Sequence, residues 1–200
     1  MAWINRLRGL IGGKHVDCHL VVVGLPNSGK STLMIQLKPP DVSMQQLVGA
    51  PPQAERAEEF HSQAITVTAF DLGTEERGHE SPWEPLFAVC HGLVFVLDCA
   101  DRFGVEQIEE QLIKLFRNPL LRRRTIPVLF LANKMDKPGA ISVLQLEDML
   151  KIKHIVVNKP WKVFQSDGLT GEGLHDGLDW LAHKLRAICR RDINEPQLRC

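Results

Sequence analysis

The residues best suited to chemistry form one short segment that could bind phosphate groups. It runs from Gly24 to Ser31, reads Gly-Leu-Pro-Asn-Ser-Gly-Lys-Ser, and lies between an apolar run and a helix-like segment. Its glycines let the backbone turn tightly, so that N–H groups converge on phosphates at a helix N-terminus. Lys30 would reach the β- and γ-phosphates, and the Ser31 hydroxyl would ligate Mg²⁺. The predicted cofactor-binding residues here are Gly24, Asn27, Ser28, Gly29, Lys30, Ser31 and Thr32.

A second segment predicts recognition of the base. An apolar run leads directly into Asn133-Lys134-Met135-Asp136, at the kind of strand end where α/β sheets bind ligands. The Asp136 carboxylate could accept from both N1–H and the exocyclic amine of guanine, whereas adenine offers only one of these donors. Asn133 could tie this loop to the phosphate-binding segment, and the aliphatic stem of Lys134 could cover the base. Ser166-Asp167 ends a later strand, where backbone N–H groups could meet the guanine oxygen.

The elements that must position these residues alternate between strands and helices. Strands are expected at 16–23, twice within 60–72, and at 92–97, 127–132 and 161–165. Helices are expected after residue 30 and at 81–89, 105–118, 142–150 and 174–188, whereas 39–57 is expected to be a loop. This alternation predicts an α/β fold, with a six-stranded, mostly parallel sheet covered by helices on both faces.

Bulk composition narrows the class of protein further. The chain has 200 residues, 44% of them hydrophobic and 24% charged, with 24 basic and 24 acidic side chains. Balanced charge gives no sign of a nucleic-acid partner. The five cysteines form no disulfide or zinc pattern, and no run approaches the roughly 18 apolar residues of a spanning helix. A cytoplasmic protein of ordinary domain size is expected.

The first residues predict an amphipathic helix. Within 1–13, apolar side chains recur at helical spacing, with Arg6 and Arg8 opposite them. Such a helix could lie on a membrane surface or pack on its own domain, and these alternatives stay open. Residue 2 is alanine, so the glycine required for N-myristoylation is absent. The expected organisation is an N-terminal helix at 1–14, a nucleotide-binding domain at 15–191 and a tail at 192–200.

Taken together, these motifs resemble the Arf-like small GTPases over almost the whole chain. The likeness rests on the two segments above and on Lys159-Pro160-Trp161, Ser166-Asp167 and the run from Gly171 to Leu181. Within that family it is strongest for the ciliary, Bardet–Biedl-associated branch that recruits the BBSome coat. The resemblance implies a Ras-like G domain that binds GTP or GDP with Mg²⁺ and hydrolyses GTP in membrane or ciliary trafficking. It also implies a coat or effector partner, peripheral membrane contact through residues 1–13, and metal binding by Ser31 and, through water, Asp71.

The sequence departs from this family where the γ-phosphate is sensed. No threonine lies between Thr32 and Thr66, although the family uses one there to ligate Mg²⁺. Glu75 replaces the glutamine that orients the attacking water, and Thr74 replaces a glycine that contacts the γ-phosphate. A carboxylate can accept from water but cannot donate, and it adds negative charge beside the phosphates. Glu75 is therefore the candidate catalytic residue, with slow GTP hydrolysis expected.

Two other interpretations remain. The chain could be a switch-defective scaffold that keeps the fold and GDP, as the altered γ-phosphate-sensing loops would suggest. It could also be a P-loop kinase of small molecules, although Asp136 after Asn133-Lys134 disfavours the adenine site that such a kinase needs.

Overall fold

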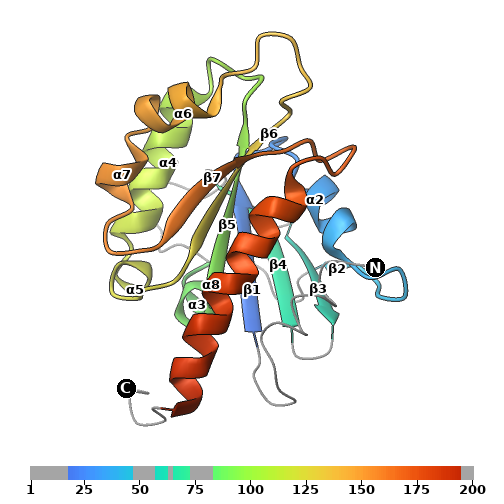
Figure 1. Ribbon diagram of the computed structural model, residues 1–200, viewed down its shortest axis with the longest axis vertical. Coiled ribbons are helices and arrows are strands. Elements are labelled where there is room, and N and C mark those ends of the chain that lie inside the picture. The colour runs from blue at the N-terminus through green and yellow to red at the C-terminus, as the bar shows by residue number, and fades with distance from the viewer. Residues whose placement is uncertain (1–17, 47–56, 63–64, 73–82, 195–200) are drawn as a thin grey trace.

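A single sheet organises the computed structural model, which describes residues 18–46, 57–62, 65–72 and 83–194. Among these residues the sheet has seven strands in the order β2-β3-β4-β1-β5-β6-β7 (Figure 1). Their bounds are β1 Cys18–Gly24, β2 Gln45–Gln46, β3 Glu58–Ser62, β4 Ile65–Asp71, β5 Gly92–Asp98, β6 Val128–Asn133 and β7 Trp161–Gln165. The pairs β2–β3 and β3–β4 are antiparallel, and the remaining pairs are parallel.

The central strands are buried on both faces, as their continuous apolar runs predict. Five residues of β5 and five of β6 belong to the core, with Phe95 beside Phe130 across the pair. Parallel register brings the polar strand ends together. Gly24 pairs with Asp71 in β4, and Asp98 pairs with Asn133 in β6.

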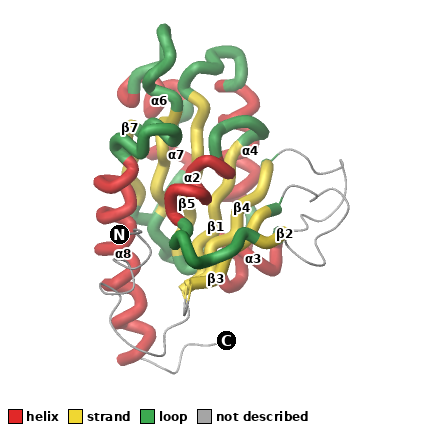
Figure 2. Tube along the Cα trace, turned by 90° about the vertical axis from the view of Figure 1, so that its right-hand side faces the viewer, coloured by secondary structure: helices red, strands yellow, loops and turns green. Residues whose placement is uncertain are grey.

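Helices cover both faces of the sheet, and two buried clusters separate them. On one face lie α2 Lys30–Leu37 and α8 Leu174–Asn194. The other face carries α3 Glu84–Val89, α4 Val105–Arg117, α5 Pro119–Arg122, α6 Val143–Met149 and α7 Ile152–Ile155. Figure 2, turned by 90°, shows the strands between these layers. The layered α/β architecture predicted from the sequence is confirmed.

Several details differ from the expected elements. The sheet has seven strands rather than six, because the two-residue β2 pairs with β3 inside the stretch expected to be a loop. Helices α5 and α7, each of four residues, were not predicted. Helix α8 runs to Asn194, so the predicted tail begins within a helix. The predicted N-terminal helix lies outside the described residues.

Candidate nucleotide-binding site

The turn from β1 into α2 has the geometry that its glycines predict. Asn27 and Gly29 both have left-handed backbone conformations, with φ of 63° and 103°. Gly29 is also required by space, because a Cβ there would lie 2.2 Å from the Asn133 Nδ2 atom. The Gly29 carbonyl accepts from Leu33 N at 3.0 Å, which starts the helix. The turn therefore aims the first N–H groups of α2 at one point, where a phosphate can accept them.

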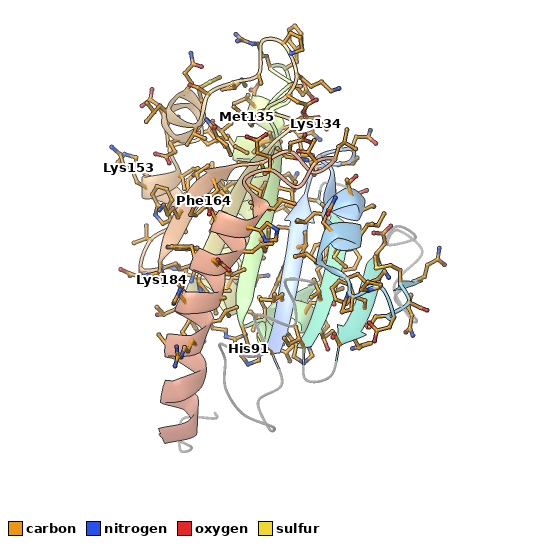
Figure 3. The ribbon with its side chains drawn as sticks, turned by 45° about the vertical axis from the view of Figure 1, so that its right-hand side comes forward. His91, Lys134, Met135, Lys153, Phe164 and Lys184 are labelled. Carbon is orange, nitrogen blue, oxygen red and sulfur yellow. The ribbon has the colours of Figure 1, made fainter. Side chains whose placement is uncertain are left out.

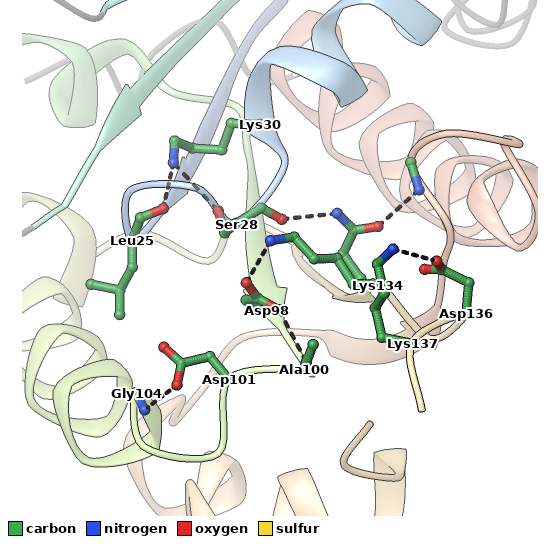
Figure 4. A network of polar contacts seen from close by, with 12 residues as sticks. Leu25, Ser28, Lys30, Asp98, Ala100, Asp101, Gly104, Lys134, Asp136 and Lys137 are labelled. Atoms are coloured by element: carbon green, nitrogen blue, oxygen red, sulfur yellow. Dashed lines mark hydrogen bonds and ion pairs between the residues drawn. The ribbon is translucent and has the colours of Figure 1, made fainter. Parts of the chain in front are cut away.

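Lys30, the first residue of α2, turns its side chain back over the loop. Its Nζ donates to the Leu25 carbonyl at 2.7 Å and to Ser28 Oγ at 3.3 Å (Figure 4). It also forms an ion pair with Asp71. The Lys30 and Asp71 side chains are 8% and 10% exposed. A nearly buried cation beside a ring of N–H donors is the arrangement that binds phosphate oxygens.

These residues line a pocket of about 770 Å³. From the phosphate-binding turn and the base loop, its walls include Asn27, Gly29, Lys30, Ser31, Thr32 and Lys134. From the sheet they include Gln45, Gln46, Glu58, Ala69 and Asp71. The Ser31 hydroxyl and Asp71 carboxylate supply the oxygen donors that Mg²⁺ prefers, so this chemistry fits the predicted metal site. Ser31 and Asp71 would hold the ion beside the phosphates.

Asn133 joins the phosphate-binding turn to the base loops. Its Nδ2 donates to the Ser28 carbonyl at 2.8 Å, and its Oδ1 accepts from Gly168 N at 2.9 Å. The side chain is buried, and both hydrogen bonds span more than thirty residues of sequence. This is the tie expected from the sequence. Both the nitrogen and the oxygen of the amide are engaged. The side chain therefore fixes the spacing between its own loop, the phosphate-binding turn and the loop at Gly168.

Lys134 follows with a left-handed backbone, at φ 63°, and lines the same pocket. Its Nζ lies 2.6 Å from Asp98 Oδ2, at the end of β5 (Figure 4). Asp98 in turn accepts from Ala100 N at 3.0 Å through its other oxygen. The ion pair holds the lysine stem across the pocket, where it could cover a flat base.

The other predicted base-binding residues lie beside this pocket rather than in its wall. Asp136, Ser166 and Asp167 line a neighbouring hollow of about 740 Å³. Asp136 is exposed, 3.4 Å from Lys137 Nζ. Asp167 accepts from the Thr170 hydroxyl and Leu169 N, and these bonds lower the pKa of its carboxyl group.

The expected backbone donors to guanine already have acceptors within the protein. Ser166 N donates to the Ala132 carbonyl at 2.8 Å, and Asp167 N donates to the Glu172 carbonyl at 3.0 Å. A guanine oxygen would have to replace one of these bonds. The structure thus assembles the phosphate half and Lys134 in one pocket, whereas Asp136, Ser166 and Asp167 stay at its margin.

Comparison with known proteins shows which family the chain belongs to. The profile of the ADP-ribosylation factor family matches residues 5–185. The chain belongs to this family. The Arf-like resemblance and the Ras-like G domain predicted from the sequence are confirmed, and the chain is an Arf-like GTP-binding protein.

Its relatives include ADP-ribosylation factor-like protein 6 of two animals. The Danio rerio protein is 34% identical over 188 residues, covering 94% of this chain and 99% of the relative. The Caenorhabditis elegans protein is 33% identical over 185 residues, covering 92% and 95%. Among solved structures, the Arl6 BBS3 small GTPase from Trypanosoma brucei, with bound nucleotide analogue GppNp, has a TM-score of 0.66 and 29% identity. That match covers 87% of this chain and 98% of the other. The predicted likeness to the Bardet–Biedl-associated branch is confirmed.

Sequence reasoning missed three contributors to the site of this Arf-family chain. Asp98 pairs with Lys134, Gly168 donates to Asn133, and Glu58 lines the phosphate pocket. Asp98 carried a usable signal, since it is a polar residue at the end of a buried strand. Glu58 carried none, because it lies at the start of a short strand beside an expected loop.

Thr74 and Glu75 lie outside the described residues. Cys18, Cys90 and Cys99 are buried, and the described part of the chain contains no group of three or more His, Cys, Asp or Glu side chains that could hold a metal ion. No helix among the described residues is long and apolar enough to cross a membrane.

Proposed function

We propose that this Arf-like protein binds GDP and GTP with Mg²⁺ in the pocket around Lys30 and hydrolyses GTP slowly. The observation that carries the proposal is the convergence of Lys30, Ser31, Asp71 and Lys134 on one pocket. The solved relative named above was determined with a bound nucleotide analogue, which supports the same ligand class here.

Each side chain then has a defined task. Lys30 and the N–H groups of the turn neutralise phosphate oxygens, while Asn133 keeps the turn at a fixed distance from the base loops. Lys134 covers the base, and Asp136 selects guanine by accepting two hydrogen bonds. Ser31 and, through water, Asp71 would hold Mg²⁺, and the ion would supply positive charge beside the phosphates.

Slow hydrolysis is expected from the residue types at the positions that sense the γ-phosphate in the family. Intrinsic hydrolysis by small GTPases is on the order of 10⁻⁴ s⁻¹ even with a glutamine to position water. Glu75 cannot donate a hydrogen bond, and the family's Mg²⁺-ligating threonine has no counterpart between Thr32 and Thr66. We expect a rate below that of a conventional member.

Single-turnover hydrolysis of radiolabelled GTP tests this expectation. Glu75→Gln restores the amide and should raise the rate several-fold, whereas the matched change Glu110→Gln, on an exposed position of α4, should leave it unchanged. A parent rate in the ordinary range of small GTPases, dependent on Mg²⁺, would contradict slow hydrolysis.

The alternative is a scaffold that retains GDP without switching, which the missing threonine also favours. A switch must bind its two ligands in distinguishable states. Amide hydrogen exchange of the GDP form and of a form with a non-hydrolysable GTP analogue distinguishes the two functions. Identical patterns would support the scaffold.

We propose that residues 1–13 give the protein peripheral membrane contact. The proposed partner is a BBSome-like coat. The proposed location is the cytoplasmic side of membranes or the base of the cilium. Both proposals rest on the resemblance to the ciliary relatives and on the amphipathic pattern. Co-sedimentation of the full chain with anionic vesicles, against Leu7→Glu, tests the membrane contact. Equal binding by both would overturn it.

A further inference from the structure

The outer edge of β7 is an open margin of the sheet. β7 is the last strand in the sheet order, and in the described part of the chain no strand pairs with its outer side (Figure 1). Val128 N donates to the Pro160 carbonyl, and Ser166 N donates to the Ala132 carbonyl. In a parallel ladder this pattern turns the even-numbered residues of β7 toward β6. The backbone groups of Trp161, Val163 and Gln165 therefore point outward, and all of them except the Gln165 carbonyl, which the turn at Gly173 covers, could pair with a further strand.

A hollow follows this edge between the helices of the two faces. It is about 740 Å³ in volume and touches the consecutive residues Val163, Phe164 and Gln165. One wall is Val143 of α6, and the other is Asp176 of α8. A hollow that reaches three consecutive strand residues and a helix on each face must lie over the strand edge. Figure 3 shows Met135 and Phe164 along this side of the molecule.

A separate pocket lies at the beginning of β7. This second pocket, of about 260 Å³, touches Trp161 and the outer side of α6. Leu144, on the wall of this second pocket, is 80% exposed and offers apolar surface there. The far end is closed, because the turn at Gly173 packs so tightly that a Cβ there would lie 2.0 Å from the Gln165 carbonyl. The open part of the β7 edge is therefore long enough to pair with only one short peptide segment.

The charge along this edge is uneven. The larger hollow is lined by four carboxylates and, among the described residues, by no basic side chain; its acids are Asp136, Asp167, Glu172 and Asp176. Nearby cations are engaged, since Lys137 pairs with Asp136 and the Lys162 ammonium lies 4.6 Å from the centre of the Phe164 ring. The smaller pocket is mixed, with two carboxylates beside Lys151, Lys153 and His154. A ligand should thus carry its positive charge at the Gln165 end.

We propose that the β7 edge binds an extended basic peptide segment of a partner protein as an additional strand. Main-chain hydrogen bonds to Val163 and Gln165 would supply the pairing, and alternate side chains would separate to the two walls. Basic side chains face Glu172 and Asp176 on the α8 side, while apolar ones face Val143 and Leu144 on the α6 side. The two acids that the proposal uses, Glu172 and Asp176, do not line the phosphate pocket, whereas Asp136 and Asp167 of the same hollow belong to the predicted base site.

The test titrates the full ¹⁵N-labelled chain with a blocked pentapeptide of alternating lysine and valine, and with its glutamate–valine counterpart. The basic peptide should bind saturably and slow amide exchange at Val163 and Gln165. Glu172→Lys with Asp176→Lys should weaken binding about tenfold or more. The matched reversal, Glu106→Lys with Glu110→Lys on exposed positions of α4, should not.

A second variant addresses the backbone directly. Gln165→Pro removes an outward-pointing N–H at an exposed edge position, where proline is tolerated. The variant should keep the melting temperature of the parent protein. Its affinity for the basic peptide should nevertheless be lower. Equal binding of both peptides, or unchanged exchange at Val163, would overturn strand addition. So would self-association through this edge, detected by sedimentation and abolished by the charge reversal, because the occupant would then be a second copy.

Discussion

At the scale of single residues, Asn133 has the most demanding position in the site. Its amide donates to Ser28 and accepts from Gly168, so one side chain holds the phosphate turn and a base loop together. Both partners are backbone groups in segments far apart in sequence. Removing the amide would leave buried donors and acceptors without a partner, which costs more than the bonds themselves contribute.

We expect Asn133→Ala to lower the free energy of unfolding by about 2 to 4 kcal/mol, since two buried polar groups lose their partners. Nucleotide affinity should fall as well, because the phosphate turn loses its fixed distance to Lys134. Urea denaturation and GDP titration measure the two effects. Gln107→Ala, an exposed amide on α4, is the control and should change neither. Equal stability of the two variants would contradict the role of the tie.

Sequence motifs predicted local geometry at two places, whereas the binding roles of the site residues remain predictions. The phosphate turn and the Asn133 tie are present as expected. The Lys134–Asp98 ion pair was not predicted, because it depends on the pairing of Asp98 with Asn133 across two strands. Neither the exposure of Asp136 nor the internal bonds of Ser166 and Asp167 can be read from residue types alone.

At the scale of elements, the buried parallel strands were predictable because apolar runs and strand lengths are local signals. Short elements were not, since tertiary contacts stabilise them. Helix α5 begins where Asn118 Oδ1 accepts from Leu120 N at 2.9 Å, and α7 follows the left-handed Lys151, at φ 49°. Strand β2 exists only through its pairing with β3. None of these carries a hydrophobic period of its own.

The turn that leads into α8 gives an element-scale prediction. Gly173 and Gly139 both have left-handed backbones, with φ of 72° and 78°. At Gly173 a Cβ would lie 2.0 Å from the Gln165 carbonyl oxygen, whereas at Gly139 nothing lies within 4 Å. Gly139→Ala should therefore cost only conformational strain, about 1 to 2 kcal/mol.

Gly173→Ala should cost at least about twice as much, because the turn must also move away from β7. Thermal and urea unfolding of the two variants, side by side, measure the difference. Similar losses of stability would show that the turn does not pack against β7 as closely as the structure indicates.

At the scale of the whole molecule, the fold brings the carboxyl ends of β1, β4, β5, β6 and β7 to one end of the sheet. Every predicted phosphate or base contact among the described residues lies at or next to such a strand end, which is where open α/β sheets bind ligands. The central claim is that this end binds guanine nucleotide through Lys30, Lys134 and Asp136. Family membership supports the ligand class, and base selection can be measured directly.

The decisive measurement is a titration of the full chain with fluorescent GDP, with Mg²⁺ and with EDTA, competed by GDP, inosine diphosphate and ADP. We expect tight binding that weakens in EDTA and nearly disappears in Lys30→Ala. Inosine diphosphate lacks the exocyclic amine, so it should compete at least about tenfold less well than GDP, and ADP less well still. Equal competition by all three, or binding unaffected by Lys30→Ala, would contradict a guanine site in this pocket.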